Sequence, residues 1–145
     1  MDRAQLIQAL GQIVGPESVV SDPDELKVYE TDGLTIFKAT PDVVALPRSA
    51  EEVAATVRLC VRERIPFVPR GAGTGLSGGA LALEGGVVIG LNRMNQILEV
   101  DYANQRAVIE PGLINVWLTN RVISDGYYYA PDPASQTACS VGGNV

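Results

Sequence analysis

The chain has 145 residues, enough for one domain with a core, and 46% apolar residues with a mean hydropathy of +0.13 indicate a globular protein. Its net charge of −6 and its lack of a Lys/Arg cluster argue against nucleic acid or an anionic membrane surface as partner. Two cysteines and no histidine exclude a Cys/His zinc site and a Cys/His catalytic pair. We therefore expect reduced thiols, no metal and no transmembrane segment, and a cytoplasmic location because the N-terminus also lacks a signal-peptide core.

Residues 1–40 are predicted to form a helical N-terminal segment. Asp2 can cap a first helix, which Gly15-Pro16 ends, and a second short helical stretch is expected at 21–29, before a turn at 31–33. The acidic residues of this segment resemble a paired-carboxylate cluster, but we interpret them as helix caps and solvated side chains. They are Asp22, Asp24, Glu25, Glu30 and Asp32.

Residues 41–101 are predicted to form a first subdomain built on a βαβ unit. A strand at 43–46 precedes a helix that a capping box at 49–52 opens. A second buried strand, at 65–68, should run parallel to the first and deliver the next segment to the carboxyl end of the sheet, where ligands gather. The helix is expected to bury one stripe, comprising Val53, Val57, Cys60 and Val61.

That next segment is a glycine-rich loop, Pro69-Arg70-Gly71-Ala72-Gly73-Thr74-Gly75-Leu76-Ser77-Gly78-Gly79. Its glycines permit positive φ and let successive N–H groups turn toward one side, which suits the anionic oxygens of a phosphate. The alternative is a long hairpin loop or linker, but the loop stands between two apolar runs, at 65–68 and 87–91.

Two familiar phosphate loops fit this stretch poorly. Residues 73–78 match G-x-G-x-x-G, with Glu99 or Asp101 at the distance of a ribose-binding acid, but residues 80–86 are too short and glycine-bounded for the required helix. A Walker loop fails because the lysine is absent. We therefore predict a loop between two strands that binds phosphate mainly through its backbone, with Arg70 as the nearby cation.

Residues 102–145 are predicted to begin a second subdomain. Strands at 97–101 and 106–110 form a hairpin, Pro111-Gly112 breaks it, and a helix at 114–124 follows with Trp117 expected in the core. Residues 127–129 are expected to form a short strand. A proline-stiffened loop and a second glycine pair, Gly142-Gly143, complete the sequence.

Three stretches carry a resemblance to a known family: residues 69–80, residues 108–112, and residues 129–135 together with 139–144. In this order and spacing they resemble the FAD domain of the vanillyl-alcohol-oxidase (PCMH-type) flavoproteins, and among these the group of glycolate oxidase flavin subunits and D-lactate and D-2-hydroxyglutarate dehydrogenases. The resemblance implies an α+β fold, a PCMH-type FAD-binding domain of two α+β subdomains with the second truncated.

The resemblance also implies FAD as a non-covalent cofactor, since there is no histidine for a histidyl link, although Cys139 is a conceivable anchor. The glycines at 142 and 143 would let the backbone approach a flat ring system. The residues expected to contact the cofactor are Pro69, Arg70, Gly71, Ala72, Gly73, Thr74, Gly75, Leu76, Ser77, Gly78, Gly79, Pro111, Gly112, Pro131, Asp132, Pro133, Ser135, Cys139, Ser140, Gly142, Gly143 and Asn144.

The activity implied is oxidation of a small 2-hydroxy acid, of the glycolate or D-lactate type, to the 2-oxo acid. Electrons would pass to partner subunits, an iron–sulfur subunit among them, which could also hold the protein peripherally at a membrane. The catalytic and metal-binding residues of such proteins are expected beyond Val145, so the chain would be an inactive N-terminal fragment. The alternatives are the FAD-binding domain of another flavin-dependent reductase or oxidase, a nucleotide-binding module, and a catalytically silent truncated chain.

Overall fold

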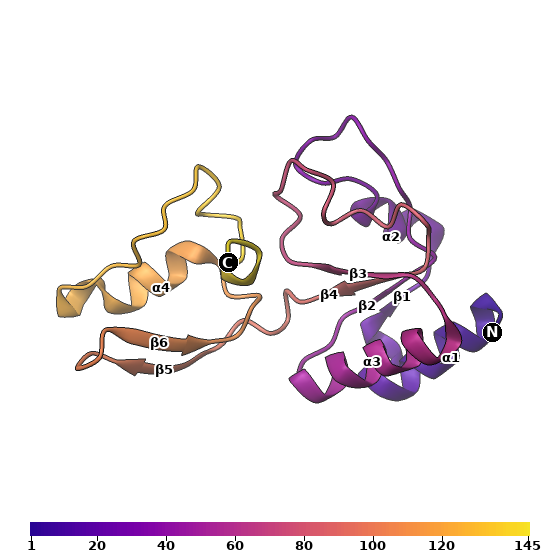
Figure 1. Ribbon diagram of the computed structural model, residues 1–145, viewed down its shortest axis with the longest axis horizontal. Helices are drawn as coiled ribbons and strands as arrows, with labels where there is room; N and C mark the ends of the chain where they lie inside the picture. Colours follow the sequence, from indigo (N-terminus) through magenta and orange to yellow (C-terminus); the bar gives the residue numbers. More distant parts are fainter.

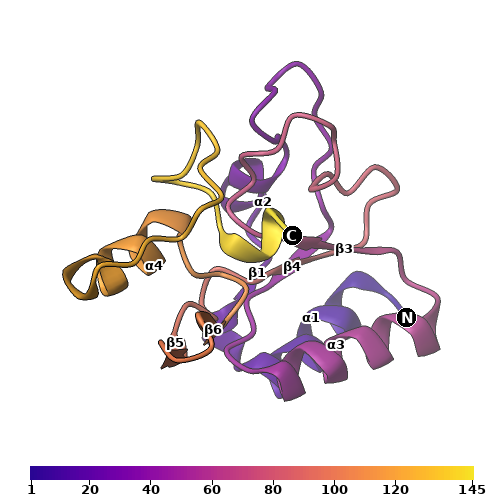
Figure 2. The same ribbon diagram turned by 60° about the vertical axis from the view of Figure 1, so that its left-hand side comes forward.

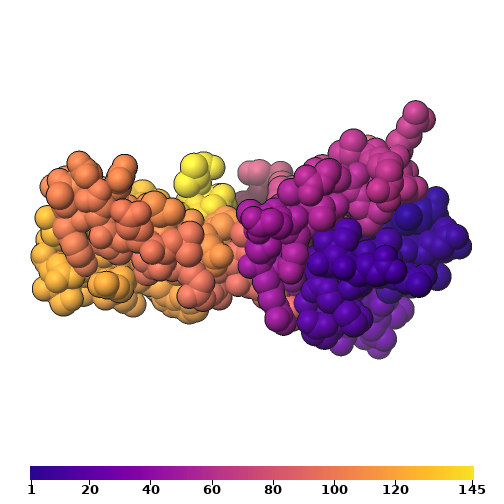
Figure 3. Space-filling model, turned by 90° about the horizontal axis from the view of Figure 1, so that it is seen from below, coloured from indigo at the N-terminus to yellow at the C-terminus, as the bar shows by residue number.

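The computed structural model describes all 145 residues, which form two lobes joined by a narrow neck (Figure 1). A space-filling view places the indigo-to-magenta residues in one lobe and most orange-to-yellow residues in the other (Figure 3). The helices and strands are α1 (Arg3–Val14), β1 (Val19–Val20), α2 (Pro23–Leu26), β2 (Val43–Ala45), α3 (Ala50–Glu63), β3 (Phe67–Arg70), β4 (Val87–Gly90), β5 (Ile97–Asp101), β6 (Arg106–Ile109) and α4 (Asn115–Val122). Short 3₁₀ turns lie at Pro16–Ser18, Lys27–Tyr29, Ile123–Asp125 and Val141–Gly143.

The first lobe is built on a four-stranded sheet in the order β1-β2-β4-β3. Strand β4 lies between β2 and β3 and runs parallel to both, whereas β1 is antiparallel to β2. All four residues of β4 are buried, which identifies it as the centre of the sheet. Helices α1 and α3 cover one face (Figure 1), and α2 with the glycine-rich segment covers the other.

The core of this lobe consists of two apolar layers, one on each face of the sheet. Burying such side chains stabilises the lobe by about 25 cal/mol for each Å² of apolar surface removed from water. The layer beneath α1 and α3 contains Leu6, Leu10, Val14, Val43, Ala45, Leu59, Cys60, Val87 and Ile89. The opposite layer contains Leu26, Val44, Leu46, Ala82 and Val88.

The helix ends follow from their capping residues. Asp2 accepts a hydrogen bond from the backbone N–H of Gln5 at 2.8 Å, and the Gln5 side chain accepts one from the Asp2 N–H at 3.0 Å. This reciprocal pair satisfies backbone donors that the first helical turn leaves free. At α3, Ser49 caps the N–H of Glu52, but the Glu52 carboxylate accepts from the N–H of Arg48. The predicted capping box is therefore shifted by one residue on its return side.

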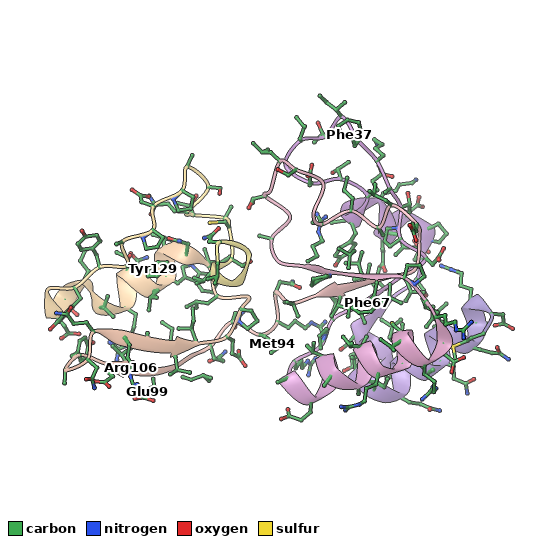
Figure 4. The ribbon with its side chains drawn as sticks, viewed as in Figure 1. Phe37, Phe67, Met94, Glu99, Arg106 and Tyr129 are labelled. Carbon is green, nitrogen blue, oxygen red and sulfur yellow. The ribbon has the colours of Figure 1, made fainter.

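Two predicted buried features of the first lobe are wrong in detail. The stripe of α3 faces the sheet through Thr56, Leu59 and Cys60, whereas Val61 is exposed. The strand predicted at 65–68 begins at Phe67, extends to Arg70, and is exposed at Phe67 (Figure 4). Because β4 enters the sheet between β2 and β3, β3 becomes an edge strand with a neighbour on one side only.

The second lobe begins with the hairpin of β5 and β6, in which Asp101 pairs with Arg106. The carboxylate of Asp101 accepts from the side chain and backbone N–H of Asn104 and from Arg106 Nε at 3.1 Å. These hydrogen bonds, those of Asn104 foremost, lower the pKa of Asp101. The subdomain boundary predicted at 101/102 falls inside this hairpin, because β5 pairs with β6; we propose a boundary between residues 90 and 97 instead.

Helix α4 packs on this hairpin through Leu118 and Val122, while Trp117, predicted to be core, is 48% exposed. Gly126, at φ 82°, ends the turn that follows the helix. Residues 127–129 do not form the predicted strand: the N–H of Tyr127 donates to the carbonyl of Val122 at 3.3 Å, and that of Tyr129 donates to Thr119 Oγ1 at 3.1 Å.

Residues 94–96 and 110–112 meet in the neck between the lobes and are hydrogen-bonded to each other. The N–H of Gly112 donates to the carbonyl of Met94 at 2.7 Å, and the N–H of Glu110 donates to the carbonyl of Gln96 at 2.9 Å. A Cβ atom on Gly112 would overlap the carbonyl oxygen of Leu91. Met94 is buried at this junction (Figure 4). Among the helices, none combines the length and the apolar character needed to cross a membrane.

Candidate functional site

The glycine-rich loop connects two adjacent parallel strands without an intervening helix. It leaves the carboxyl end of β3 at Arg70 and returns to the start of β4 at Val87. The prediction that it joins strand to strand is confirmed, and a hairpin loop is excluded because the two strands are parallel. The loop therefore lies at the carboxyl edge of the sheet, where ligands of such folds collect.

The backbone of this loop presents a row of donors that the chain itself does not use. None of the N–H groups of residues 71–77 donates a hydrogen bond within the protein, whereas that of Gly78 does. Gly73 and Gly78 have φ values of 72° and 78°, which few residues other than glycine adopt. Unpaired N–H groups turned into one concavity form a site for an anion.

The opposite wall is the C-terminal turn, which lies between the lobes (Figure 2). Gly71 is in close contact with Ser140, since a Cβ atom at Gly71 would overlap Ser140 Oγ. The N–H of Ser140 also lacks an acceptor in the chain. Between the walls is a cleft of about 310 Å³, lined by Pro69, Gly71, Ala72, Gly73, Thr74, Gly75, Leu76, Ser77, Gly79, Ala80, Cys139, Ser140, Gly143 and Asn144.

Most residues expected to contact the cofactor thus meet at one cleft, although some do not line it. The residues outside its lining are Arg70, Gly78, Pro111, Gly112, Pro131, Asp132, Pro133, Ser135 and Gly142. Gly142 donates to the carbonyl of Pro111 at 2.9 Å, and a Cβ atom on it would lie 2.6 Å from Pro111 Cβ. Gly142 and Pro111, together with Gly112 in the neck, hold the C-terminal wall against the hairpin.

Arg70 supports the loop from within the fold. Its side chain is 9% exposed, and its Nη1 donates to the carbonyl of Ala80 at 3.4 Å. Its guanidinium lies 5.8 Å from the ring centre of Tyr29, and a Cβ atom on Gly73 would overlap Nη2. Burial lowers the pKa of Arg70, and the charges of Tyr29 and Asp32 oppose that shift. Arg70 does not line the cleft, whose donors are backbone N–H groups and side chains such as those of Ser140 and Asn144.

Asp32 is the residue of this region that sequence reasoning missed. The sequence predicts a cap or a solvated carboxylate at both Asp22 and Asp32, and Asp22 indeed caps α2. Asp32, however, is only 6% exposed, and its Oδ2 accepts from the N–H of Gly78 at 2.9 Å. These two residues are 46 positions apart, and no local pattern marks such a long-range contact.

The two cysteines occupy different environments. Cys60 is buried in α3, and burial raises the pKa of its thiol. Cys139 lines the cleft, is 2% exposed, and its Sγ accepts from Asn144 Nδ2 at 3.3 Å. Cys139 is therefore the thiol with a place at the site.

A second hollow, of about 230 Å³, lies in the second lobe between the hairpin and the tyrosine segment that follows α4. Its lining includes Tyr102, whose hydroxyl donates to Asp125 Oδ2 at 2.6 Å. This hydrogen bond raises the pKa of Tyr102. No group of three His, Cys, Asp or Glu side chains is placed to hold a metal ion.

The chain is similar to a known domain family and to several named proteins. A family model described as "FAD binding domain" matches residues 41–145. The chain is 43% identical over all 145 residues to glycolate oxidase subunit GlcD of Escherichia coli K12, and 37% identical over 140 residues to D-2-hydroxyglutarate dehydrogenase of Stutzerimonas stutzeri. It covers 29% and 30% of the lengths of these two proteins.

A solved structure has a similar fold. The structure of 4-ethylphenol oxidase from Gulosibacter chungangensis in complex with isoeugenol matches 97% of this chain with a TM-score of 0.83 and 31% identity. The chain corresponds to 28% of that protein.

Proposed function

Because the chain belongs to the family of FAD-binding domains that its residues 41–145 match, we propose that it forms part of a flavoprotein that oxidises a small 2-hydroxy acid to the 2-oxo acid. FAD is the cofactor of this family, and the α+β fold of the chain is that of its PCMH-type members. The activity is inferred from relatives named glycolate oxidase subunit, D-2-hydroxyglutarate dehydrogenase and D-lactate dehydrogenase. The chain spans less than a third of the length of these relatives, so the proposal concerns the whole protein.

The observation that carries the proposal is the row of unpaired N–H groups at residues 71–77. A pyrophosphate has several anionic oxygens, and these can accept hydrogen bonds from a row of free backbone N–H groups. The absence of side chains at Gly71, Gly73 and Gly75 lets those oxygens approach the backbone. The residues present therefore fit the pyrophosphate of FAD.

The C-terminal wall is assigned to the flavin side of the cofactor. Ser140 and Asn144 offer polar groups there, and we infer that residues 131–135 run along the same ligand, anchored where Asn115 Nδ2 donates to the carbonyl of Pro131 at 3.2 Å. Attachment is proposed to be non-covalent, since the buried Cys139 thiol is held by Asn144 and the chain has no histidine. When bound, FAD supplies the hydride acceptor for the C2–H bond of the substrate.

Partner subunits are part of the proposal because GlcD is named as a subunit. An iron–sulfur subunit that accepts the electrons is the partner we expect, and the location proposed is cytoplasmic, with peripheral membrane association through such subunits.

Anaerobic titration of the purified full-length protein tests the proposal. A protein with visible flavin absorption that bleaches with glycolate, D-lactate or D-2-hydroxyglutarate, and not with the L-enantiomers of the chiral acids, supports it. A protein without flavin after incubation with FAD contradicts the cofactor assignment.

A second candidate follows from the 31% identity with 4-ethylphenol oxidase, namely a flavin-dependent oxidase that acts on another class of substrate. Bleaching of the flavin by 4-ethylphenol and not by any 2-hydroxy acid would favour that function. The same titration therefore separates the two candidates.

A further inference from the structure

The glycine-rich loop is held from outside by a segment that precedes the residues matched to the family. Asp32 accepts two backbone hydrogen bonds, from Leu34 N–H at 2.8 Å and from Gly78 N–H at 2.9 Å. The N–H of the next residue, Gly33, donates to the carbonyl of Gly75 at 2.8 Å. Residues 32 and 33 thus fasten the loop at two points, whereas the family match begins at residue 41.

These two points bear on the shape of the loop because its own backbone contributes little. Between residues 71 and 77 no N–H group donates within the chain, so the loop has no internal ladder. A hydrogen bond to an ionised carboxylate is about twice as strong as one between neutral groups. The fit at Gly33 is also close, since a Cβ atom there would lie 2.7 Å from the carbonyl oxygen of Thr74.

We propose that Asp32 and Gly33 are positioning residues for the pyrophosphate of FAD, acting through the loop and not by contact with the cofactor. Neither residue lines the cleft, and both bonds reach the loop at or beyond Gly75. By fixing Gly75 and Gly78, they hold in place the loop that carries the free N–H groups of residues 71–77. This inference rests on the proposed function, from which the loop receives its ligand.

The negative charge of Asp32 has the opposite effect on FAD affinity from its positioning role. A carboxylate close to a pyrophosphate site repels the ligand, so its loss would favour FAD if only charge mattered. Arg70, on which Asp32 exerts a favourable electrostatic effect, offsets part of that repulsion. Positioning and charge therefore predict opposite changes in FAD affinity when Asp32 is removed.

The chain offers a matched control in Asp42. Its Oδ2 accepts from the N–H of Gly86 at 2.7 Å, which is the same kind of bond at the far end of the same connection. Asp42 does not line the cleft, and Gly86 directly precedes β4. Asp42→Ala removes a carboxylate-to-backbone bond and leaves the anchors at Gly75 and Gly78 in place.

The test uses the full-length apoprotein and two measurements. The first is the dissociation constant for FAD by calorimetry, and the second is the rate at which thermolysin cleaves before the exposed Leu76, which requires local opening of the loop. For Asp32→Ala we expect FAD binding to be weaker by about tenfold or more, because charge-assisted hydrogen bonds are lost. We also expect faster cleavage by thermolysin. Asp42→Ala should match the wild type in both.

Other results would contradict either the positioning role of Asp32 or the proposed function on which it rests. FAD binding in Asp32→Ala that equals or exceeds that of the wild type would overturn the positioning role, and so would faster cleavage without loss of affinity. A wild-type protein that binds no FAD would overturn the proposed function itself. If Asp32→Ala does not fold, Gly33→Ala puts the same question, because it displaces the loop at Thr74 while keeping the carboxylate.

Discussion

Replacing Gly73 by alanine should weaken FAD binding in the full-length protein. Gly73 has φ 72°, and for a non-glycine residue the left-handed conformation costs about 1–2 kcal/mol. The added Cβ would also lie 2.6 Å from Arg70 Cζ, so the guanidinium must move away from the Ala80 carbonyl, at a cost of about 1 kcal/mol. We expect the free loop of the variant to relax out of this conformation, so that binding of FAD must restore it; the two terms then amount to about 2–3 kcal/mol, or a dissociation constant for FAD roughly 30 to 150 times larger.

Calorimetric titration of the apoprotein with FAD measures this change, and two other glycines serve as controls. Gly126→Ala imposes a similar backbone strain, at φ 82°, at the far end of α4 from the cleft, so it should leave the dissociation constant unchanged. Gly75→Ala meets nothing within 4 Å, so the free loop keeps its shape and any lost affinity reports direct approach of the ligand. A Gly73→Ala protein that binds FAD as tightly as the wild type would refute the reasoning.

Three further predictions concern the opposite wall and the hairpin. Gly71→Ala should weaken FAD binding on the order of tenfold by forcing Ser140 away, and adding Ser140→Ala should restore it, because Ser140 Cβ would lie 3.4 Å from the new methyl group; calorimetry that shows no such rescue would contradict the contact. Acid precipitation should release all FAD into the supernatant, whereas flavin that stays in the pellet, and no longer does so in Cys139→Ala, would establish a covalent bond. The lowered pKa of Asp101 means that its stabilisation is present above the unfolded pKa of about 3.9 and is lost as the pH falls through the lower folded value; Asp101→Asn should therefore flatten the acid-unfolding curve below that pH, and an identical curve would show that the bonds contribute nothing.

The elements that local chemistry determines could be predicted from the sequence. The start of α1 at Asp2, the start of α3 at Ser49 and the end of the helical turn at Gly126 follow from capping residues that act within one turn. The apolar run of β4 and the alternation of β5 and β6 likewise indicate strands.

What the sequence could not supply is the order in which strands assemble. Phe67 and Val68 are as apolar as the residues of β4, yet β3 is at the edge because β4 inserts beside β2. The same holds for Trp117, whose exposure depends on which face of α4 meets the hairpin, a choice made by Leu118 and Val122. Local pattern determines an element but not its neighbours.

Some parts of the candidate site could be predicted from the sequence and others could not. The glycine loop and the C-terminal turn are contiguous stretches, so their composition alone indicates a ligand. The anchors at Asp32 and Gly33 act across more than forty positions, and the buried setting of Arg70 depends on Tyr29 from another element. A carboxylate in a turn has the same local appearance whether water or a backbone 46 residues away donates to it.

The neck between the lobes restricts hinge motion. Hinge closure needs a few residues that are free to change φ and ψ. Gly112, however, lies close to the carbonyl of Leu91 and donates a hydrogen bond to the carbonyl of Met94, and Gly142 packs closely on Pro111. Rotation of the lobes about this neck is therefore restrained, and we expect the cleft to change little in width when a ligand binds. FAD affinity is then expected to depend on how many of the loop's free amides the pyrophosphate engages at once.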